Sequence, residues 1–146
     1  MAITSAVCNS FKQEILEAEH NFTGSTGNTF NLALYTSSAT LGASTTAYSS
    51  SNEITNTSGT SYSAKGKALT SVTPTLDSST AVCDFSDVSW TSASFTANGC
   101  LIFNDSHSTD AAVCAIAFGG DKTVSSGTFT IQFPAAAAST AIIRIA

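Results

Sequence analysis

The stretch of sequence that decides the fold class is Phe95-Thr96-Ala97-Asn98-Gly99-Cys100-Leu101-Ile102-Phe103. Apolar or small residues occupy every second position from Phe95 to Phe103, so they share one face of an extended chain. Residues 127–133 repeat the pattern, because Phe129, Ile131 and Phe133 alternate with polar residues. Alternation with a period of two predicts β-strands with one face toward a core.

Further short apolar runs predict strands throughout the second half of the chain. The predicted strands cover residues 67–73 (before Pro74), 80–85, 88–90, 95–103, 112–118, 127–133 and 141–145. Turn-forming residues separate them, such as Asn104-Asp105-Ser106 and Gly119-Gly120-Asp121. No helical pattern intervenes, and many short strands without helices between them favour an antiparallel β-sandwich.

The N-terminal segment follows a different period. Ile3, Val7, Phe11 and Ile15 recur every fourth position, which predicts one apolar stripe on a helix over residues 5–19. We therefore expect a mainly β fold, an antiparallel β-sandwich with a short N-terminal α-helix. The length suits a single domain over residues 1–146, with a helical segment at 1–22 and a β-rich body at 23–146.

The segment that follows the predicted helix is less regular. The period changes to two at Phe30, which predicts a half-buried strand over residues 30–35. Residues 36–62 are dense in Ser, Thr, Gly and Asn, with only a few apolar residues between them. This composition indicates a long surface excursion with one weak strand at residues 48–54. Low-complexity disorder is the alternative.

Charge is scarce in this chain. Asp, Glu, Lys and Arg make up 10% of the residues, against about 25% in a typical domain. Ser and Thr account for 46 of the 146 residues, so hydroxyl groups form much of the predicted surface. The five basic residues are scattered from Lys12 to Arg144 and the net charge is −5. We therefore expect no binding to nucleic acid or to a membrane.

The cysteines and the start of the chain indicate a reducing compartment. Residues 1–5 lack the basic and apolar pattern of a secretory signal, so we expect folding in a cytosol. The four cysteines show no Cys-x-x-Cys spacing, which disfavours a metal cluster. We expect four reduced, buried thiols, and no metal or other cofactor.

Motifs that carry chemistry are weak throughout. The chain has two histidines, His20 and His107, and none of the common nucleophile or phosphate-binding motifs, so we expect no enzymatic activity. Residues 105–110 offer oxygen and imidazole ligands for a cation, but a solvated hairpin turn explains them better. We expect His20 to cap the helix, with a ligand role as the alternative. We expect Trp90 in the core, with an exposed sugar-binding or partner-binding role as the alternative.

The chain resembles a family of small structural proteins of tailed phages, including cyanophages. No single motif carries this resemblance; the order and spacing of several runs carry it together. These runs are residues 10–16, 29–36, 39–48, 118–123, 127–134 and 141–146. One departure concerns Asn98, where the family pattern has an arginine.

The resemblance implies a place in the virion. Within that class, we expect a cement (decoration) protein on the capsid exterior, assembled in the host cytoplasm and bound to the major capsid protein. The alternatives are a tail, neck or fibre component of the same particle, or a carbohydrate-binding module.

A homo-oligomer, most simply a trimer, is expected for physical reasons as well. The predicted helix stripe and the last predicted strand lie at opposite ends of the chain, and each presents an apolar face. A thin sandwich leaves such faces to be covered by another subunit. The candidate subunit contacts are therefore Phe11, Ile15, Ile143 and Ile145.

Overall fold

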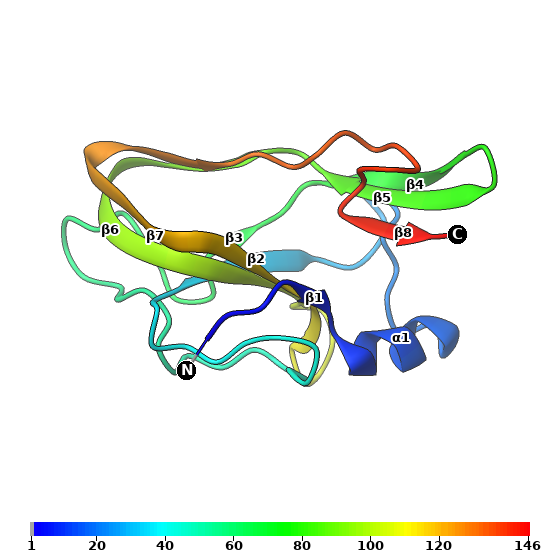
Figure 1. Cartoon of the computed structure of the whole chain (residues 1–146), viewed down its shortest axis with the longest axis horizontal. Helices are drawn as coiled ribbons and strands as arrows, with labels where there is room; N and C mark the ends of the chain where they lie inside the picture. Colours follow the sequence, from blue (N-terminus) through cyan, green and yellow to red (C-terminus); the bar gives the residue numbers. More distant parts are fainter. Residues whose placement is uncertain (1) are drawn as a thin grey trace.

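The described part of the chain, residues 2–146 of a computed structural model, is mainly β, with 47% of its residues in strands and 6% in helix. The elements follow in the order β1 (Ala6–Val7), α1 (Asn9–Leu16), β2 (Phe30–Tyr35), β3 (Lys67–Ala68), β4 (Ser71–Asp77), β5 (Thr80–Phe85), β6 (Val88–Asn104), β7 (Ala111–Ile131) and β8 (Ile143–Ile145). They form a large antiparallel sheet in the order β1-β7-β6-β2-β3 and a small one in the order β4-β5-β8. Figure 1 shows the sheets as two layers, with α1 at one end below the small sheet. The predicted β-sandwich with an N-terminal helix is confirmed.

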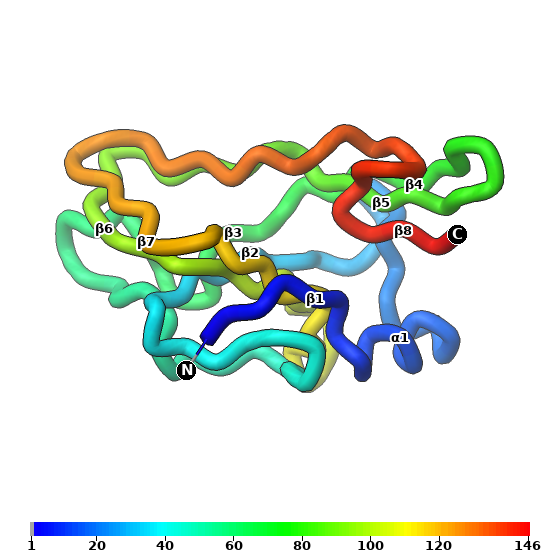
Figure 2. The backbone as a smooth tube through the Cα atoms, in the orientation of Figure 1, coloured from blue at the N-terminus to red at the C-terminus, as the bar shows by residue number. Residues whose placement is uncertain are grey.

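A long β6–β7 ribbon connects the two layers. Separate strands were expected at residues 88–90 and 95–103, and again at 112–118 and 127–133, but each pair forms one continuous strand. The ribbon bends without ending, because its register shifts between Trp90 and Ala93, between Ala93 and Phe95, and between Ala97 and Gly99. Such bulges bend a strand pair and leave it hydrogen-bonded. Figure 2 shows the ribbon turning back over the large sheet.

Strand β2 is buried on both faces, so the expected half-buried strand is wrong in this respect. Its second face is covered by the segment over residues 36–66. On that face, the Asn31 side-chain amide donates to the Lys65 carbonyl at 3.4 Å, and the Tyr35 hydroxyl donates to the Ser49 carbonyl at 2.7 Å. At the edge of the strand, the Leu34 N–H donates to the Tyr62 hydroxyl at 2.9 Å. A strand covered in this way needs apolar or hydrogen-bonded side chains on both faces.

The covering segment is anchored rather than strand-like. The weak strand expected at residues 48–54 is absent from the described part of the chain, where Glu53 makes only an isolated bridge to Tyr35. Four apolar residues hold the segment against the body; they are Ala39, Leu41, Ile54 and Tyr62, all buried. The segment therefore follows one path over β2, and disorder does not describe it.

The helix is shorter than predicted. It covers Asn9–Leu16 instead of residues 5–19, because the residues before it pair with strands. Ala6 and Val7 lie opposite Ala115 and Cys114 of β7, and Cys8 donates its N–H to Val113 at 2.9 Å. A spacing of four residues puts side chains on one face of a strand as well as on one face of a helix. The four residues of the stripe therefore do pack inward. Ile3 and Val7 belong to extended chain, however, and only Phe11 and Ile15 belong to the helix.

Three further strand boundaries differ from the prediction. Residues 67–73 are divided between β3 and β4, and β4 continues through Pro74. A proline is tolerated there because β4 is an edge strand with a register shift beside Pro74. Strand β8 begins at Ile143, later than predicted. Strand β5 has the predicted bounds, Thr80–Phe85.

Candidate functional site

An apolar groove opens between α1 and the small sheet. Its volume is about 450 Å³, within the range of roughly 300–1,000 Å³ that is typical of ligand sites. Helix α1, the loop after it and all three strands of the small sheet contribute to its lining. The lining residues are Phe11, Ile15, Ala18, His20, Asn21, Phe22, Thr23, Pro74, Ala81, Val82, Cys83, Ile143 and Ile145. Most of these side chains are apolar, so the groove favours an apolar occupant.

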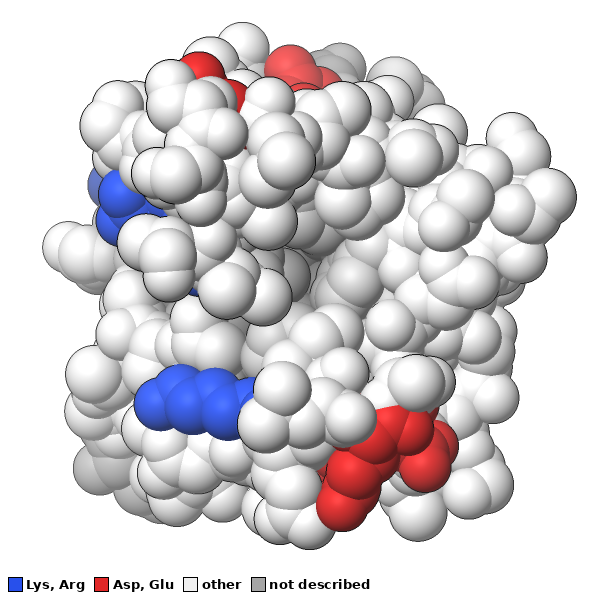
Figure 3. Space-filling view, turned by 90° about the vertical axis from the view of Figure 1, so that its right-hand side faces the viewer, with Lys and Arg blue, Asp and Glu red and all other residues white. Residues whose placement is uncertain are grey.

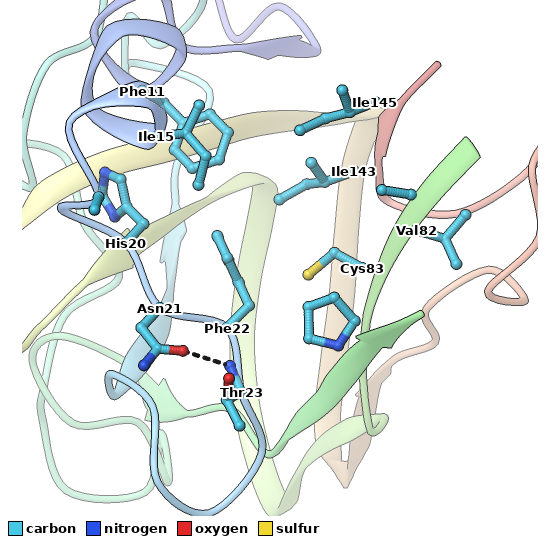
Figure 4. A pocket seen from close by; sticks show the side chains of 13 residues that line it. Phe11, Ile15, His20, Asn21, Phe22, Thr23, Val82, Cys83, Ile143 and Ile145 are labelled. Atoms are coloured by element: carbon cyan, nitrogen blue, oxygen red, sulfur yellow. Dashed lines mark hydrogen bonds between the residues drawn. The ribbon is translucent and has the colours of Figure 1, made fainter. Parts of the chain in front are cut away.

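All four candidate contact residues line this groove. Figure 4 shows Ile143 and Ile145 pointing from β8 toward Phe11 and Ile15 of α1. The sequence suggested two separate apolar faces, and the structure makes them opposite walls of one feature. Phe11 and Ile143 are 4% and 7% exposed, and Ile145 is 57% exposed. The first two therefore form the base of the groove within the subunit, while Ile145 stands at its opening.

One apolar residue of α1 lies outside the lining of the groove. Leu16, the last residue of α1, is 88% exposed. It directly follows Ile15, a residue of the predicted apolar stripe, but its own side chain lies in solvent. A left-handed residue, Ala18 at φ 60°, marks that end. The exposure of Leu16 could not be predicted from the sequence, because the helix was expected to continue to residue 19 and it ends at residue 16.

The β8 wall is an ordered part of the small sheet. Ile143 lies opposite Cys83, and Ile145 lies opposite Ala81, so these side chains share the face that lines the groove. Arg144 lies on the other face and is exposed, with its guanidinium donating to the Ala138 carbonyl at 2.9 Å. Because the order is β4-β5-β8, one edge of β8 has no neighbouring strand in the described part of the chain.

The two histidines come together beside the groove. His20 is buried and does not cap the helix carbonyls as expected; its Nε2 lies 2.7 Å from a Glu14 carboxylate oxygen. The Asn104 amide nitrogen lies 3.1 Å from His20 Nδ1, so both ring nitrogens of His20 have a polar partner. The ring of His107 stacks on that of His20 at a centroid distance of 6.2 Å. His20 is therefore a hydrogen-bonded part of the groove's base.

The two carboxylates of residues 105–110 form ion pairs with Lys65 of the same chain. The Lys65 ammonium lies 2.8 Å from a carboxylate oxygen of Asp105 and 2.8 Å from one of Asp110. The hydrogen bonds to Asp105 and then to Asp110 raise the pKa of Lys65. No cluster of three or more acidic, histidine or cysteine residues suited to a metal occurs among residues 2–146. Lys65 thus takes the place that a metal ion would need.

Trp90 is a core residue. It is 1% exposed and packs among aromatic rings, with centroids 6.0 Å from Tyr62 and 6.3 Å from both Phe95 and Phe129. The core interpretation is confirmed. The alternative in which an exposed Trp90 binds a sugar or a partner is wrong, because the ring cannot reach a ligand.

The four cysteines are free and buried. Burial raises the pKa of Cys8 to about 11 and the pKa of Cys83 and Cys114 to about 12, and it raises the pKa of Cys100 as well. Such thiols stay protonated near neutral pH and are poor nucleophiles. They serve the molecule as small apolar side chains.

The end of the molecule that carries the groove has an uncharged centre, with charged side chains of α1, the loop after it and β8 around it (Figure 3). Figure 3 shows this end, with a hollow formed by uncharged residues and a few charged side chains near its margins. No helix among the described residues has the length and hydropathy needed to cross a bilayer. Two large aliphatic side chains at this end, Leu16 of α1 and Ile145 of β8, are exposed.

Comparisons with protein-family models, with curated proteins and with solved structures find no match to this chain. The resemblance to phage structural proteins thus remains a hypothesis.

Proposed function

We propose that this protein is a non-enzymatic structural subunit that acts by binding other protein chains, with the groove between α1 and the small sheet as its docking site. In its specific form, the proposal is a cement protein on the capsid exterior of a tailed phage, bound to the major capsid protein. The observation that carries the general proposal is the groove of about 450 Å³ with apolar walls. The specific form rests on the sequence resemblance.

The energetics favour a protein partner. Burying exposed aliphatic side chains such as Leu16 and Ile145 lowers the free energy by about 25 cal/mol for each Å² removed from water. Stable protein interfaces bury about 800 Å² on each partner. The exposed area of the groove lining is smaller than about 800 Å². The groove is therefore the anchor point of a wider contact.

The surface chemistry suits a particle exposed to water. Hydroxyl-bearing residues dominate the composition and charged residues are few. Such a surface stays hydrated through neutral hydrogen bonds, which salt screens less than it screens charge pairs. A homotrimer at the local three-fold positions of a capsid remains part of the proposal, because symmetric binding repeats one contact over the shell.

A tail, neck or fibre role is the second candidate within the same class. The same groove serves either location, since both require protein contacts. The number of copies in each particle separates them: hundreds indicate the capsid, and a small multiple of the tail symmetry indicates the tail or neck.

The experiment combines particle composition with a groove variant. Quantitative mass spectrometry of purified particles gives the copy number, and reconstituted particles are then exposed to the wild type, Ile145→Asp or Leu76→Asp. Ile145 lines the groove, whereas Leu76 is an exposed residue of β4 outside its lining. We expect Ile145→Asp to abolish particle binding and Leu76→Asp to preserve it. Absence of the protein from purified particles would refute the virion role.

A further inference from the structure

Strand β8 presents an unpaired edge beside an apolar groove. Backbone groups of residues 142–146 bond no element other than β5 among the described residues. Ile143 and Ile145 place their side chains in the groove, so a strand added along β8 would place its own inward side chains at the same opening. This combination of free edge and apolar pocket is the geometry of recognition by strand addition.

The opposite edge of the small sheet is closed to such pairing. Strand β4 contains Pro74, which has no N–H to donate, and its register shifts between Val72 and Thr75. Prolines and bulges are the usual devices that prevent edge-to-edge association. Strand β8 has neither device, although it is short.

Arg144, the charged residue of β8, favours a segment of another protein over a second copy of this chain. Arg144 lies between the two isoleucines and projects from the outer face of the sheet. If two copies paired β8 with β8 over the whole strand, Arg144 would face its own equivalent, and like charges directly opposite destabilise a strand pair. A segment of a different protein with an acidic residue at that position forms a favourable pair instead.

We propose that the open edge of β8 binds an extended segment of a partner protein, in which an Asp or Glu flanked by aliphatic residues pairs opposite Arg144. The aliphatic residues lie opposite Ile143 and Ile145 and enter the groove. The inference rests on the proposed function and deepens it, since it states which segment of a partner the docking site recognises. The backbone hydrogen bonds supply affinity, and the Arg144 pair and the groove supply selectivity.

The test uses the full chain and a short blocked peptide with the central sequence Thr-Val-Glu-Val-Thr, labelled for fluorescence anisotropy. A peptide with Lys in place of Glu is the matched control. We expect saturable binding below about 1 mM for the Glu peptide and about fivefold weaker binding for the Lys peptide. Arg144→Glu should reverse this preference, and Ile145→Asp should remove binding of both peptides.

Two controls make the result interpretable. Leu76→Asp alters an exposed residue outside the groove lining and should leave binding unchanged. Because Arg144 and Ile145 are both exposed, their variants should unfold at the wild-type temperature, which a thermal melt checks. Absence of binding, or an Arg144→Glu variant that keeps the wild-type preference, would overturn the proposal. Dimerisation of the free chain through β8, seen by sedimentation and lost in Ile145→Asp, would show that a second copy is the occupant and would overturn it too.

The test is independent of the virion role. Peptide binding is measured on the isolated chain, whereas copy number is measured on particles. A protein present in particles that does not bind the peptide would refute the β8 inference alone.

Discussion

Glu53 joins three residues of the covering segment, which lie 5, 9 and 12 positions away in the sequence. One carboxylate oxygen accepts the Tyr62 hydroxyl and the Lys65 N–H, each at 2.7 Å, and the other accepts the Tyr48 hydroxyl at 2.5 Å. Tyr62 in turn accepts the Leu34 N–H of β2. The Glu53 side chain therefore ties the covering segment together, and Tyr62 connects this network to the central strand. Nothing in the local pattern of residues 48–54 indicates this.

At this residue scale, Tyr62→Phe should destabilise the protein more than Tyr48→Phe. Both lose a hydrogen bond to Glu53, but only Tyr62→Phe also leaves the buried Leu34 N–H without an acceptor. We expect a loss of about 2 kcal/mol in the free energy of unfolding for Tyr62→Phe and about 1 kcal/mol for Tyr48→Phe. Urea denaturation measures both. Equal losses would mean that the Leu34 contact contributes nothing.

Gly66 offers a second test at the residue scale. It has φ +68°, and a Cβ at this position would lie 1.8 Å from the Leu32 carbonyl oxygen. Gly66→Ala should therefore cost well over about 2 kcal/mol, because backbone must move. Gly59 is the matched control: it also has a positive φ of +88°, but a Cβ added there would have no atom within 4 Å. Gly59→Ala should cost about 1 kcal/mol, and a similar loss at both sites would contradict the steric argument.

At the scale of elements, α1 packs against the body through one face, on which Phe11 is the buried residue. Phe11 packs against His20 and Phe22, with ring centroids at 5.0 and 5.9 Å. Phe11→Ala should thus cost about 3–5 kcal/mol. Leu16→Ala, on the same helix, should change stability by less than about 0.5 kcal/mol, because Leu16 is exposed. Thermal and urea denaturation test the pair, and a large loss at Leu16 would mean that the helix packs differently.

At the scale of the whole molecule, stability should fall in alkaline solution. Thiols of the unfolded chain lose protons near pH 9, whereas those of the folded chain do so only near pH 11 for Cys8 and near pH 12 for Cys83 and Cys114. Burial also raises the pKa of Tyr48 to about 12. Above about pH 9 the unfolded state binds fewer protons than the folded state, so the free energy of unfolding decreases as the pH rises.

Urea denaturation from about pH 8 to about pH 11, in the presence of a reducing agent, measures this decrease. Cys83→Ala removes one of the thiols and should reduce the slope. A stability that stays constant over this range would show that the thiols are accessible in the folded protein.

The sequence by itself determined the fold class and most of the core. Alternating apolar residues identified strands in the second half of the chain, and β5 was predicted with its observed bounds. The stripe from Ile3 to Ile15 was correctly recognised as a face that packs against the core. The four candidate contact residues line one groove, and their role as subunit contacts stays a prediction. These successes have one cause: the period of apolar residues is a local property that survives in any tertiary context.

Tertiary structure alone decided how these pieces are used. A spacing of four residues is compatible with helix and strand, and pairing with β7 made residues 6–7 a strand. Bulges joined four predicted strands into one ribbon, and Lys65 closed the Asp105–Asp110 turn from 40 residues away in the sequence. The groove arises because α1 and β8, from opposite ends of the chain, meet across it. Each of these outcomes depends on which distant backbone or side-chain group satisfies a local one, and a local pattern does not contain that information.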